Sequence, residues 1–328
     1  MIAFITGATG FIGSHITDVL LSHGFRVRCG FREHSNLQWL KDKPVELVKY
    51  SLFDEKSLSD ALKEVDYIIH CGGTIMAKKP SVFFHVNRDG TINLLKSALE
   101  QTPNLKRFVY ISSQTVGGPA KALTEPISEF DQPNPVTNYA KSKKEAEDHV
   151  LEYGKYFPVT ILRPSAVVGP RDPAIFTIFK SIKNRIVILI GMKKKYLNII
   201  HAVDLAEATY NAAISDNTIG KIYYIADEMP VSWNEIMSIG KRELNRNFTL
   251  NIHFPHFFVL GAAYSFEQFR RIIGKPHPFN LDKGRDFIQK YWTCSVDCAK
   301  KDFNFSPKFS PEEAVLDTIR WYVNNKWL

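Results

Sequence analysis

Two residues four positions apart, Tyr139 and Lys143, have the types and the spacing needed for proton transfer. On a helix this spacing places both side chains on one face. An ammonium beside a phenol stabilises the phenolate, so we expect Lys143 to lower the pKa of Tyr139 from about 10 toward neutral pH. A tyrosine tuned in this way can exchange a proton with a carbonyl or carbinol oxygen. As a bare pattern, Tyr-x-x-x-Lys is also typical of a surface helix.

Two hydroxyl side chains, Ser112 and Ser113, follow the apolar run Phe108-Val109-Tyr110-Ile111. The run predicts a buried strand, and ligands of parallel α/β sheets bind beyond the carboxyl ends of the strands. A serine at such a strand end can hydrogen-bond a reacting oxygen while the tyrosine handles the proton. Side chains alternate along a strand, so only one of the two serines faces the cleft. Taken singly, either serine is equally explained as a turn residue that satisfies backbone groups.

Three glycines, Gly7, Gly10 and Gly13, lie between a strand-like run at 2–6 and an apolar helix pattern at 11–22. Glycines at these places allow a sharp turn, a close approach of the backbone to phosphate, and tight packing of helix on strand. The helix N-terminus adds free N–H groups and the positive end of the helix dipole. We therefore expect the pyrophosphate of a dinucleotide here. The alternative is an ordinary strand–turn–helix in which glycine serves only the turn.

Short apolar runs alternate with helix-length amphipathic segments through the first half of the chain. Strands are expected at 2–6, 26–30, 45–49, 67–71, 108–112 and 159–162, with helices at 11–22 and 81–100 among the connections. This alternation predicts an α/β fold, a doubly wound parallel sheet with helices on both faces. We expect residues 1–162 to form the dinucleotide-binding domain. Residues 163–328 are expected to form mainly a smaller α/β substrate lobe, with some segments returning to the first domain.

The charge of the chain limits the classes of partner. A net charge of +8, from 42 basic and 34 acidic residues, suits an anionic cofactor or substrate, or loose contact with an anionic membrane surface. Basic and aromatic residues are not interleaved, so no nucleic-acid partner is expected. The densest basic run, Lys193-Lys194-Lys195, is interpreted as a solvated turn.

Cysteine usage and apolar runs exclude other classes of protein. Four cysteines in 328 residues form no disulfide framework, and no second pair completes a zinc site with Cys294 and Cys298, so no metal is expected. No apolar run reaches the ~20 residues of a spanning helix. The segment 254–264 is too short to span, although it leaves peripheral membrane contact open. The first strand begins at residue 2, so no signal peptide is expected and the cytoplasm is the default location.

Together these motifs resemble the extended short-chain dehydrogenase/reductase family, of the NAD-dependent epimerase/dehydratase type. The resemblance covers nearly the whole chain and is strongest to dihydroflavonol-reductase-like and 3-beta-hydroxysteroid-dehydrogenase-like members. Beyond the glycine loop and the Ser, Tyr and Lys, the matching segments are Ile69-His70-Cys71-Gly72-Gly73, Val86-Asn87-Arg88, Leu162-Arg163-Pro164, Val168-Gly169-Pro170 and His201-Ala202-Val203-Asp204. Val203 departs from the family pattern, in which an acidic residue is usual.

The resemblance implies a Rossmann domain and hydride transfer between nicotinamide C4 and a substrate carbon, with Tyr139 as acid and base. It implies that Ser113, rather than Ser112, orients the substrate oxygen, that Lys143 binds the nicotinamide ribose, and that Asn87 supports the site. The implied cofactor-binding residues are Gly7, Thr9, Gly10, Phe11, Ile12, Gly13, Arg32, Leu52, Cys71, Gly72, Gly73, Tyr139, Lys143 and Pro164. Members often dimerise through two helices of the cofactor half, so we expect a homodimer.

The end of the second predicted strand bears on the choice of cofactor. An acidic residue there would favour NAD, but this chain has Phe31 followed by Arg32. A guanidinium suits a 2′-phosphate, so we favour NADP over NAD. Arg32 could instead be a surface residue over the adenine. Ser51 replaces the aspartate that the family usually has after the third strand, which weakens the prediction for Leu52 at the adenine.

The substrate class is less strongly indicated. An apolar ketone or alcohol is favoured because no arginine precedes His201 where sugar-nucleotide enzymes often carry one, and because residues 248–278 are aromatic and suit an apolar lid. The layout from Gly274-Lys275-Pro276 to Trp292 also looks like the tail of the hydroxysteroid-dehydrogenase-like members. The aromatic residues could equally pack a core. The alternatives are a nucleotide-sugar epimerase or dehydratase with tightly bound NAD, and a non-catalytic protein on the same fold.

Overall fold

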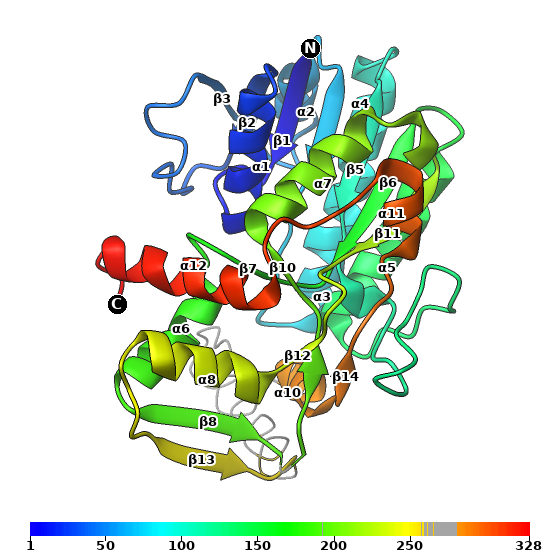
Figure 1. Cartoon of the computed structure of the whole chain (residues 1–328). Coiled ribbons are helices and arrows are strands. Elements are labelled where there is room, and N and C mark those ends of the chain that lie inside the picture. Colours follow the sequence, from blue (N-terminus) through cyan, green and yellow to red (C-terminus); the bar gives the residue numbers. More distant parts are fainter. Residues whose placement is uncertain (192, 257, 259–260, 262–264, 266–280) are drawn as a thin grey trace.

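The computed structural model describes residues 1–191, 193–256, 258, 261, 265 and 281–328 (Figure 1). Most of the expected lid at 248–278, including Phe257 and the segment Gly274-Lys275-Pro276, lies outside the described residues. None of the described helices is long and apolar enough to cross a bilayer.

A seven-stranded sheet, in which every neighbouring pair is parallel, forms the centre of the structure. Its order is β11-β6-β5-β4-β1-β2-β3. The strands are β1 (Ile2–Thr6), β2 (Arg26–Phe31), β3 (Val45–Lys49), β4 (Tyr67–His70), β5 (Arg107–Ile111), β6 (Val159–Pro164) and β11 (Lys221–Ile225). The predicted α/β fold with a doubly wound parallel sheet is therefore confirmed.

Helices cover both faces of this sheet, as continuous apolar strands require. One face carries α1 (Phe11–Ser22) and α7 (Ala202–Ile214), which pack through residues such as Ile16 and Leu205. The other face carries α2 (Glu55–Leu62), α4 (Gly90–Gln101) and α5 (Asn138–Tyr153), through Leu58, Leu94 and Val150. Strands β1, β4 and β5 are buried along their whole length because they lie between these two layers.

The helix expected at 81–100 is not continuous. The chain forms α3 (Pro80–Phe83), then a π-helical stretch η1 (Phe84–Asp89), and only then α4. The wide turn contains Asn87, whose side chain bonds Thr74 and Ser142 and ties this stretch to α5. These tertiary hydrogen bonds override the simple helical period, and π turns of this kind occur frequently at functional sites.

The second half of the chain forms a lobe below the carboxyl edge of the sheet (Figure 1). Its strands are β7 (Ala166–Val168), β8 (Ile186–Ile190), β9 (Tyr196–Leu197), β10 (Ile199–His201), β12 (Val231–Ser232), β13 (Leu250–Phe254) and β14 (Tyr291–Trp292). Its helices are α6 (Pro173–Lys183), α8 (Trp233–Glu243), α10 (Leu281–Ile288) and α12 (Pro311–Asn324). Three of these helices, α6, α8 and α12, share one apolar core.

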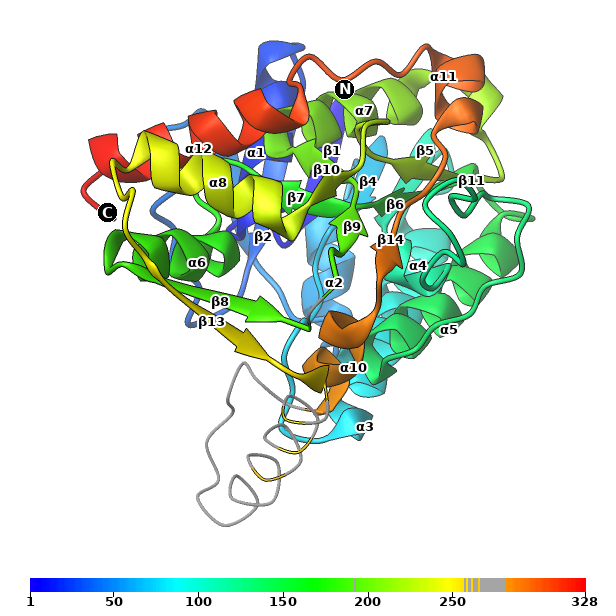
Figure 2. The same cartoon turned by 60° about the horizontal axis from the view of Figure 1, so that its bottom comes forward.

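Three segments of the second half pack on the sheet domain rather than in the lobe. Strand β11 pairs with β6, α7 packs against α1, and α11 (Asp297–Phe303) packs on β11. Figure 2 shows α10 away from α11, beside α3 and the end of α5 that carries Tyr139. The carboxyl edge of the sheet therefore faces elements that come from both halves of the sequence.

Candidate active site

The glycine loop is shaped by contacts that exclude side chains. Gly7 has a φ of 72°, and a Cβ on Gly13 would lie 2.2 Å from the Gly7 carbonyl oxygen. A Cβ on Gly7 would lie 2.9 Å from Cα of Gly72, which follows β4. Gly10 caps α1 with no side-chain hydrogen bond, which leaves the first turn of the helix open to an anion. These features fit the pyrophosphate of a dinucleotide.

The predicted cofactor residues after β4 lie beside this loop. Thr6 joins the two strand ends, because its hydroxyl accepts from Gly72 N at 3.0 Å and bonds His70 Nδ1 at 2.6 Å. A Cβ on Gly73 would lie 3.0 Å from Asn87 Oδ1 and 3.8 Å from Lys143 Nζ. Thr9, Phe11, Ile12 and Cys71 are all half-buried along the same edge. The structure thus places these predicted residues on one continuous strip from α1 to α5.

Two arginines in and after β2 differ in exposure. Arg32, the residue after the strand, is exposed, whereas Arg28 within the strand is buried and donates to the carbonyls of Ala61 and Lys63. Arg28 also pairs with Glu46, so it points away from the edge where a dinucleotide would lie. Leu52 is half-buried after β3, and its carbonyl accepts from Asn93.

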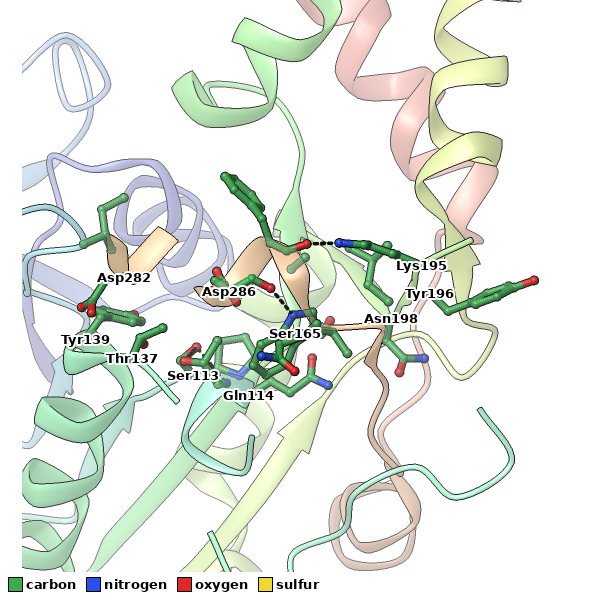
Figure 3. Close-up of a pocket in the computed structure, with 18 of the residues that line it drawn as sticks. Ser113, Gln114, Thr137, Tyr139, Ser165, Lys195, Tyr196, Asn198, Asp282 and Asp286 are labelled. Atoms are coloured by element: carbon green, nitrogen blue, oxygen red, sulfur yellow. Dashed lines mark hydrogen bonds between the residues drawn. The ribbon is translucent and has the colours of Figure 1, made fainter. Parts of the chain in front are cut away.

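Ser113 and Tyr139 meet in a cavity of about 280 Å³ at the carboxyl ends of β5 and β6 (Figure 3). Ser113 begins η2 (Gln114–Val116), where it accepts from the Thr115 backbone and hydroxyl groups. Thr137 caps α5 through Ala140 N, which fixes Tyr139 in the first helical turn. The Ser113 hydroxyl lies close enough to the phenol of Tyr139 to act on its pKa. Ser112 is buried next to Ser113. It is absent from the described residues that line the cavity, which agrees with the alternation of side chains along a strand.

The expected lowering of the Tyr139 pKa is not found, because burial acts in the opposite direction. Burial raises the pKa of the Tyr139 phenol to about 12, and the nearby Ser113 hydroxyl opposes this rise only in part. Lys143 Nζ donates to the Ile111 carbonyl at 2.8 Å and lies 4.5 Å from the centre of the Tyr110 ring. Burial lowers the pKa of Lys143 itself to about 8. Desolvation is therefore the largest influence on the pKa of both side chains in this arrangement.

Asn87 and Pro164 occupy supporting positions. Asn87 is buried; it accepts from Thr74 N at 2.7 Å and donates to Ser142 Oγ at 3.0 Å, one residue before Lys143. Pro164 ends β6 and lines the cavity beside Ser165. Asn87 thus ties the π-helical stretch to the helix that carries Tyr139 and Lys143.

Other residues of the cavity carry no sequence motif. Asp282 of α10 bonds Asn138 at the start of α5, and Gln114 and Ser165 extend the two strand ends.

The interpretation of the basic run at 193–195 as a solvated turn is wrong for Lys195. Lys193 and Lys194 are exposed, but Lys195 is buried, donates to the Phe287 carbonyl, and has its pKa lowered to about 8 by burial. Of the cavity residues that carry no motif, only Gln114 and Ser165 could have been identified from the sequence, by their positions just after two predicted strands.

A second, larger cavity adjoins the first. It measures about 610 Å³ and shares Lys195, Trp233 and Phe287 with the cavity that holds Ser113 and Tyr139. Its lining is mainly aliphatic and aromatic and comes from α6, β8, α8 and β13. The site therefore joins a polar compartment at the sheet to an apolar compartment in the lobe.

Known proteins with similar sequences span the same length. The chain is 26% identical to the ceramide reductase of Caulobacter vibrioides, over 99% of this chain and 95% of that protein. It is 27% identical to the 3 beta-hydroxysteroid dehydrogenase/Delta 5-->4-isomerase of Mycobacterium tuberculosis, over 98% and 90% of the two chains.

Solved structures agree in fold. The crystal structure of gox2253 has a TM-score of 0.82 at 26% identity and covers 99% of this chain and 98% of its own. The UDP-glucose 4-epimerase of Thermotoga maritima, solved with UDP-glucose, also has a TM-score of 0.82, at 20% identity, over 99% and 100% of the two chains. Residues 3–226 match the family model described as NAD dependent epimerase/dehydratase family. The chain belongs to the NAD dependent epimerase/dehydratase family, as its motifs predicted.

Proposed function

We propose that this protein is an NADP(H)-dependent oxidoreductase that interconverts a ketone and a secondary alcohol of a mainly apolar small molecule. The close approach of Ser113 to Tyr139 carries this proposal, because both residues line one cavity at the edge of the sheet where the glycine loop also lies. Proton transfer and phosphate binding are thus available on the same side of one sheet.

Tyr139, Ser113 and Lys143 have different roles in carbonyl reduction. A nicotinamide held at Lys143 would supply the hydride, and with it the two electrons, for reduction of the carbonyl carbon. Tyr139 gives its phenolic proton to the carbonyl oxygen, so that the carbonyl π bond becomes a C–H and an O–H bond. Ser113 donates to the same oxygen and polarises the carbonyl before transfer. Lys143, now bonded to the Ile111 carbonyl, would bind the ribose hydroxyls of the nucleotide.

Arg32 supports NADP as the cofactor. It is exposed after β2, on the strand next to β1 and its glycine loop, while Arg28 is committed to Glu46 and to backbone carbonyls. Phe31 offers no carboxylate that would repel a 2′-phosphate or accept from a ribose hydroxyl. The exposed guanidinium can instead bind phosphate by charge-assisted hydrogen bonds.

The adjoining apolar cavity supports an apolar substrate. Its walls include Ile182, Ile188, Leu189, Met237 and Phe254, and it adjoins the catalytic cavity, with which it shares lining residues. A substrate whose reacting carbon lies at Tyr139 could extend an apolar portion into this space. Relatives of similar length are named as reductases or dehydrogenases of ceramide and steroids, which are also largely apolar.

A cytoplasmic homodimer remains our expectation for the assembled protein. Helices α4 and α5 lie side by side, and each exposes a leucine, Leu99 and Leu151. These helices belong to the cofactor half, through which the extended family often dimerises. Light scattering after gel filtration tests this expectation, because a monomeric mass at micromolar concentration contradicts it.

Mass spectrometry of the cofactor released from purified protein, paired with a screen of ketones for NADPH oxidation, tests the function. We expect little bound nucleotide and NADPH oxidation with ketones that carry an apolar chain. Stoichiometric, tightly held NAD with no net oxidation of NADPH would overturn the proposal. That result would favour a nucleotide-sugar epimerase, which returns its hydride to the same substrate.

A further inference from the structure

Two buried polar side chains in the catalytic cavity have no hydrogen-bond partner among the described residues. The Nε2 atom of Gln114 and the Oγ atom of Ser165 are both shielded, and the two residues are 3% and 7% exposed. Buried polar groups in native proteins are nearly always paired, because an unpaired group loses its bonds to water. Two such groups in one cavity therefore point to a ligand that completes them.

The strand register brings the two residues together. Ile111 of β5 pairs with Leu162 of β6, and Gln114 and Ser165 each lie three residues beyond that pair. Their backbones are fixed, since the Gln114 carbonyl accepts from Gly117 N and Ser165 N donates to the Ile225 carbonyl, each at 3.0 Å. Figure 3 shows both in the lining of the cavity near Ser113.

Neighbouring polar groups in this lining are already occupied. Asn198 accepts from Cys294 N and donates to the Asp227 carbonyl. Asp282 uses both carboxylate oxygens on Asn138, and Thr137 caps α5. Gln289 donates to the Arg285 carbonyl. The unpaired groups thus stand apart from side chains that serve the fold.

We propose that Gln114 and Ser165 bind a second, uncharged oxygen of the substrate, a hydroxyl or carbonyl within two carbons of the carbon that reacts. The carboxamide offers a donor and the hydroxyl offers both a donor and an acceptor, which matches such an oxygen. Gln114 directly follows Ser113, so this oxygen lies close to the one that Ser113 and Tyr139 hold. The inference rests on the proposed function and narrows its substrate to oxygenated apolar molecules.

Binding to matched ligands tests this inference without turnover. The NADP⁺-loaded protein is titrated with medium-chain ketones that carry a tertiary α-hydroxyl or β-hydroxyl, which NADP⁺ cannot oxidise, and with the simple ketone of the same length. Trp233 and Trp292 line the cavity, so their fluorescence reports binding. We expect a hydroxy ketone to bind at least about tenfold more tightly than its simple ketone. Gln114 and Ser165 would each add one hydrogen bond, and one hydrogen bond changes the affinity by about threefold to tenfold. Equal binding of all three, or binding of none, overturns the inference.

Variants assign the preference to the two residues. Gln114→Leu and Ser165→Ala should each reduce the preference by about threefold to tenfold and leave binding of the simple ketone unchanged. Gln289→Leu, in which the lost amide already had a partner, should keep the full preference. Thermal unfolding and NADPH binding establish that each variant folds; Ser165→Ala, which removes a single oxygen, is the conservative case. An unchanged preference in both variants, or an effect of Ser165→Ala on NADPH affinity alone, overturns the assignment.

The two proposals fail in different ways. Preference for the hydroxy ketone without any NADPH oxidation would contradict the oxidoreductase function and keep the binding site. NADPH oxidation with equal use of hydroxy and simple ketones would keep the function and contradict the binding site.

Discussion

Glu147 and Arg163 form a buried, two-bonded ion pair that ties the helix carrying Tyr139 to strand β6. Glu147 Oε2 accepts from Arg163 Nη2 at 2.7 Å, and Oε1 accepts from Nε at 3.0 Å. Arg163 also donates to Tyr224 Oη at 3.1 Å, which extends the contact to β11. The pair therefore sets the distance between Tyr139 on α5 and the strand end that continues into Ser165.

Removal of one partner of this pair should destabilise the protein strongly. In Glu147→Ala the Arg163 guanidinium stays buried without its counter-ion, for which we expect a loss of about 3–5 kcal/mol in the free energy of unfolding. Glu145→Ala on the same helix is the matched control, because Glu145 pairs with Arg88 at the surface and should cost less than about 1 kcal/mol. Urea unfolding measures both, and equal losses would contradict a structural role for the buried pair.

Asp282 should position α10 over the catalytic helix. Its Oδ2 accepts from Asn138 N at 2.9 Å and its Oδ1 from Asn138 Nδ2 at 2.8 Å. Asp282→Ala releases this contact, so we expect KM for a ketone to rise about tenfold with a smaller change in kcat. Asp60→Ala, an exposed acid on α2, should leave both parameters unchanged. A loss of kcat with unchanged KM would instead place Asp282 in the chemical step.

Arg32→Ala should weaken NADPH binding by about tenfold or more and leave NADH binding nearly unchanged, because the charge-assisted bonds to a 2′-phosphate are lost. Arg26→Ala is the matched control, since Arg26 is an exposed arginine at the opposite end of the same strand. Isothermal titration with both nucleotides gives the two ratios. Equal losses for NADPH and NADH in Arg32→Ala would remove the case for NADP.

Asp172 should make stability depend on pH. It is buried at the N-cap of α6, and burial raises its pKa from 3.8 to about 6. The native state therefore holds a proton more tightly than the unfolded chain, so this residue's contribution to stability falls as pH rises from about 4 through 6. Asp172→Asn keeps the capping oxygen and carries no charge. Relative to wild type, this variant should gain up to about 3 kcal/mol between pH 4 and pH 7.

Chemical denaturation at the two pH values measures the gain. Asp54→Asn is the control, because Asp54 caps α2 with its side chain exposed to solvent, and its difference from wild type should change little between them. A constant difference for Asp172→Asn would show that burial does not disfavour the charged carboxylate.

The sheet and the glycine loop could be predicted because local signals determine them. Six apolar runs form strands at nearly the predicted residues, and Gly7 and Gly13 lie where a side chain would clash. The helix at 81–100 was predicted as continuous because its period hides the π turn at Asn87, which depends on Thr74 and Ser142. Hydrogen bonds between distant residues leave no periodic trace in the sequence.

The electrostatics and the lobe side of the site could not be predicted for similar reasons. The spacing of Tyr139 and Lys143 indicates a shared face, but the sign of the Tyr139 pKa shift depends on burial. Lys195 was assigned to a solvated run, yet its neighbours in space come from α10, far along the chain. Asp282 likewise acts across 144 residues. Such contacts follow from how the lobe packs against the sheet domain.

The central claim is that Tyr139 transfers the proton, and Tyr139→Phe tests it most directly. The variant removes one oxygen from a residue that packs against Phe83, so NADPH affinity and thermal stability should stay within about twofold and a few degrees of wild type. NADPH oxidation with the best ketone of the screen should fall by at least about a hundredfold, as expected when a general acid is removed. Turnover within a few-fold of wild type, in a variant that binds NADPH normally, would contradict the account.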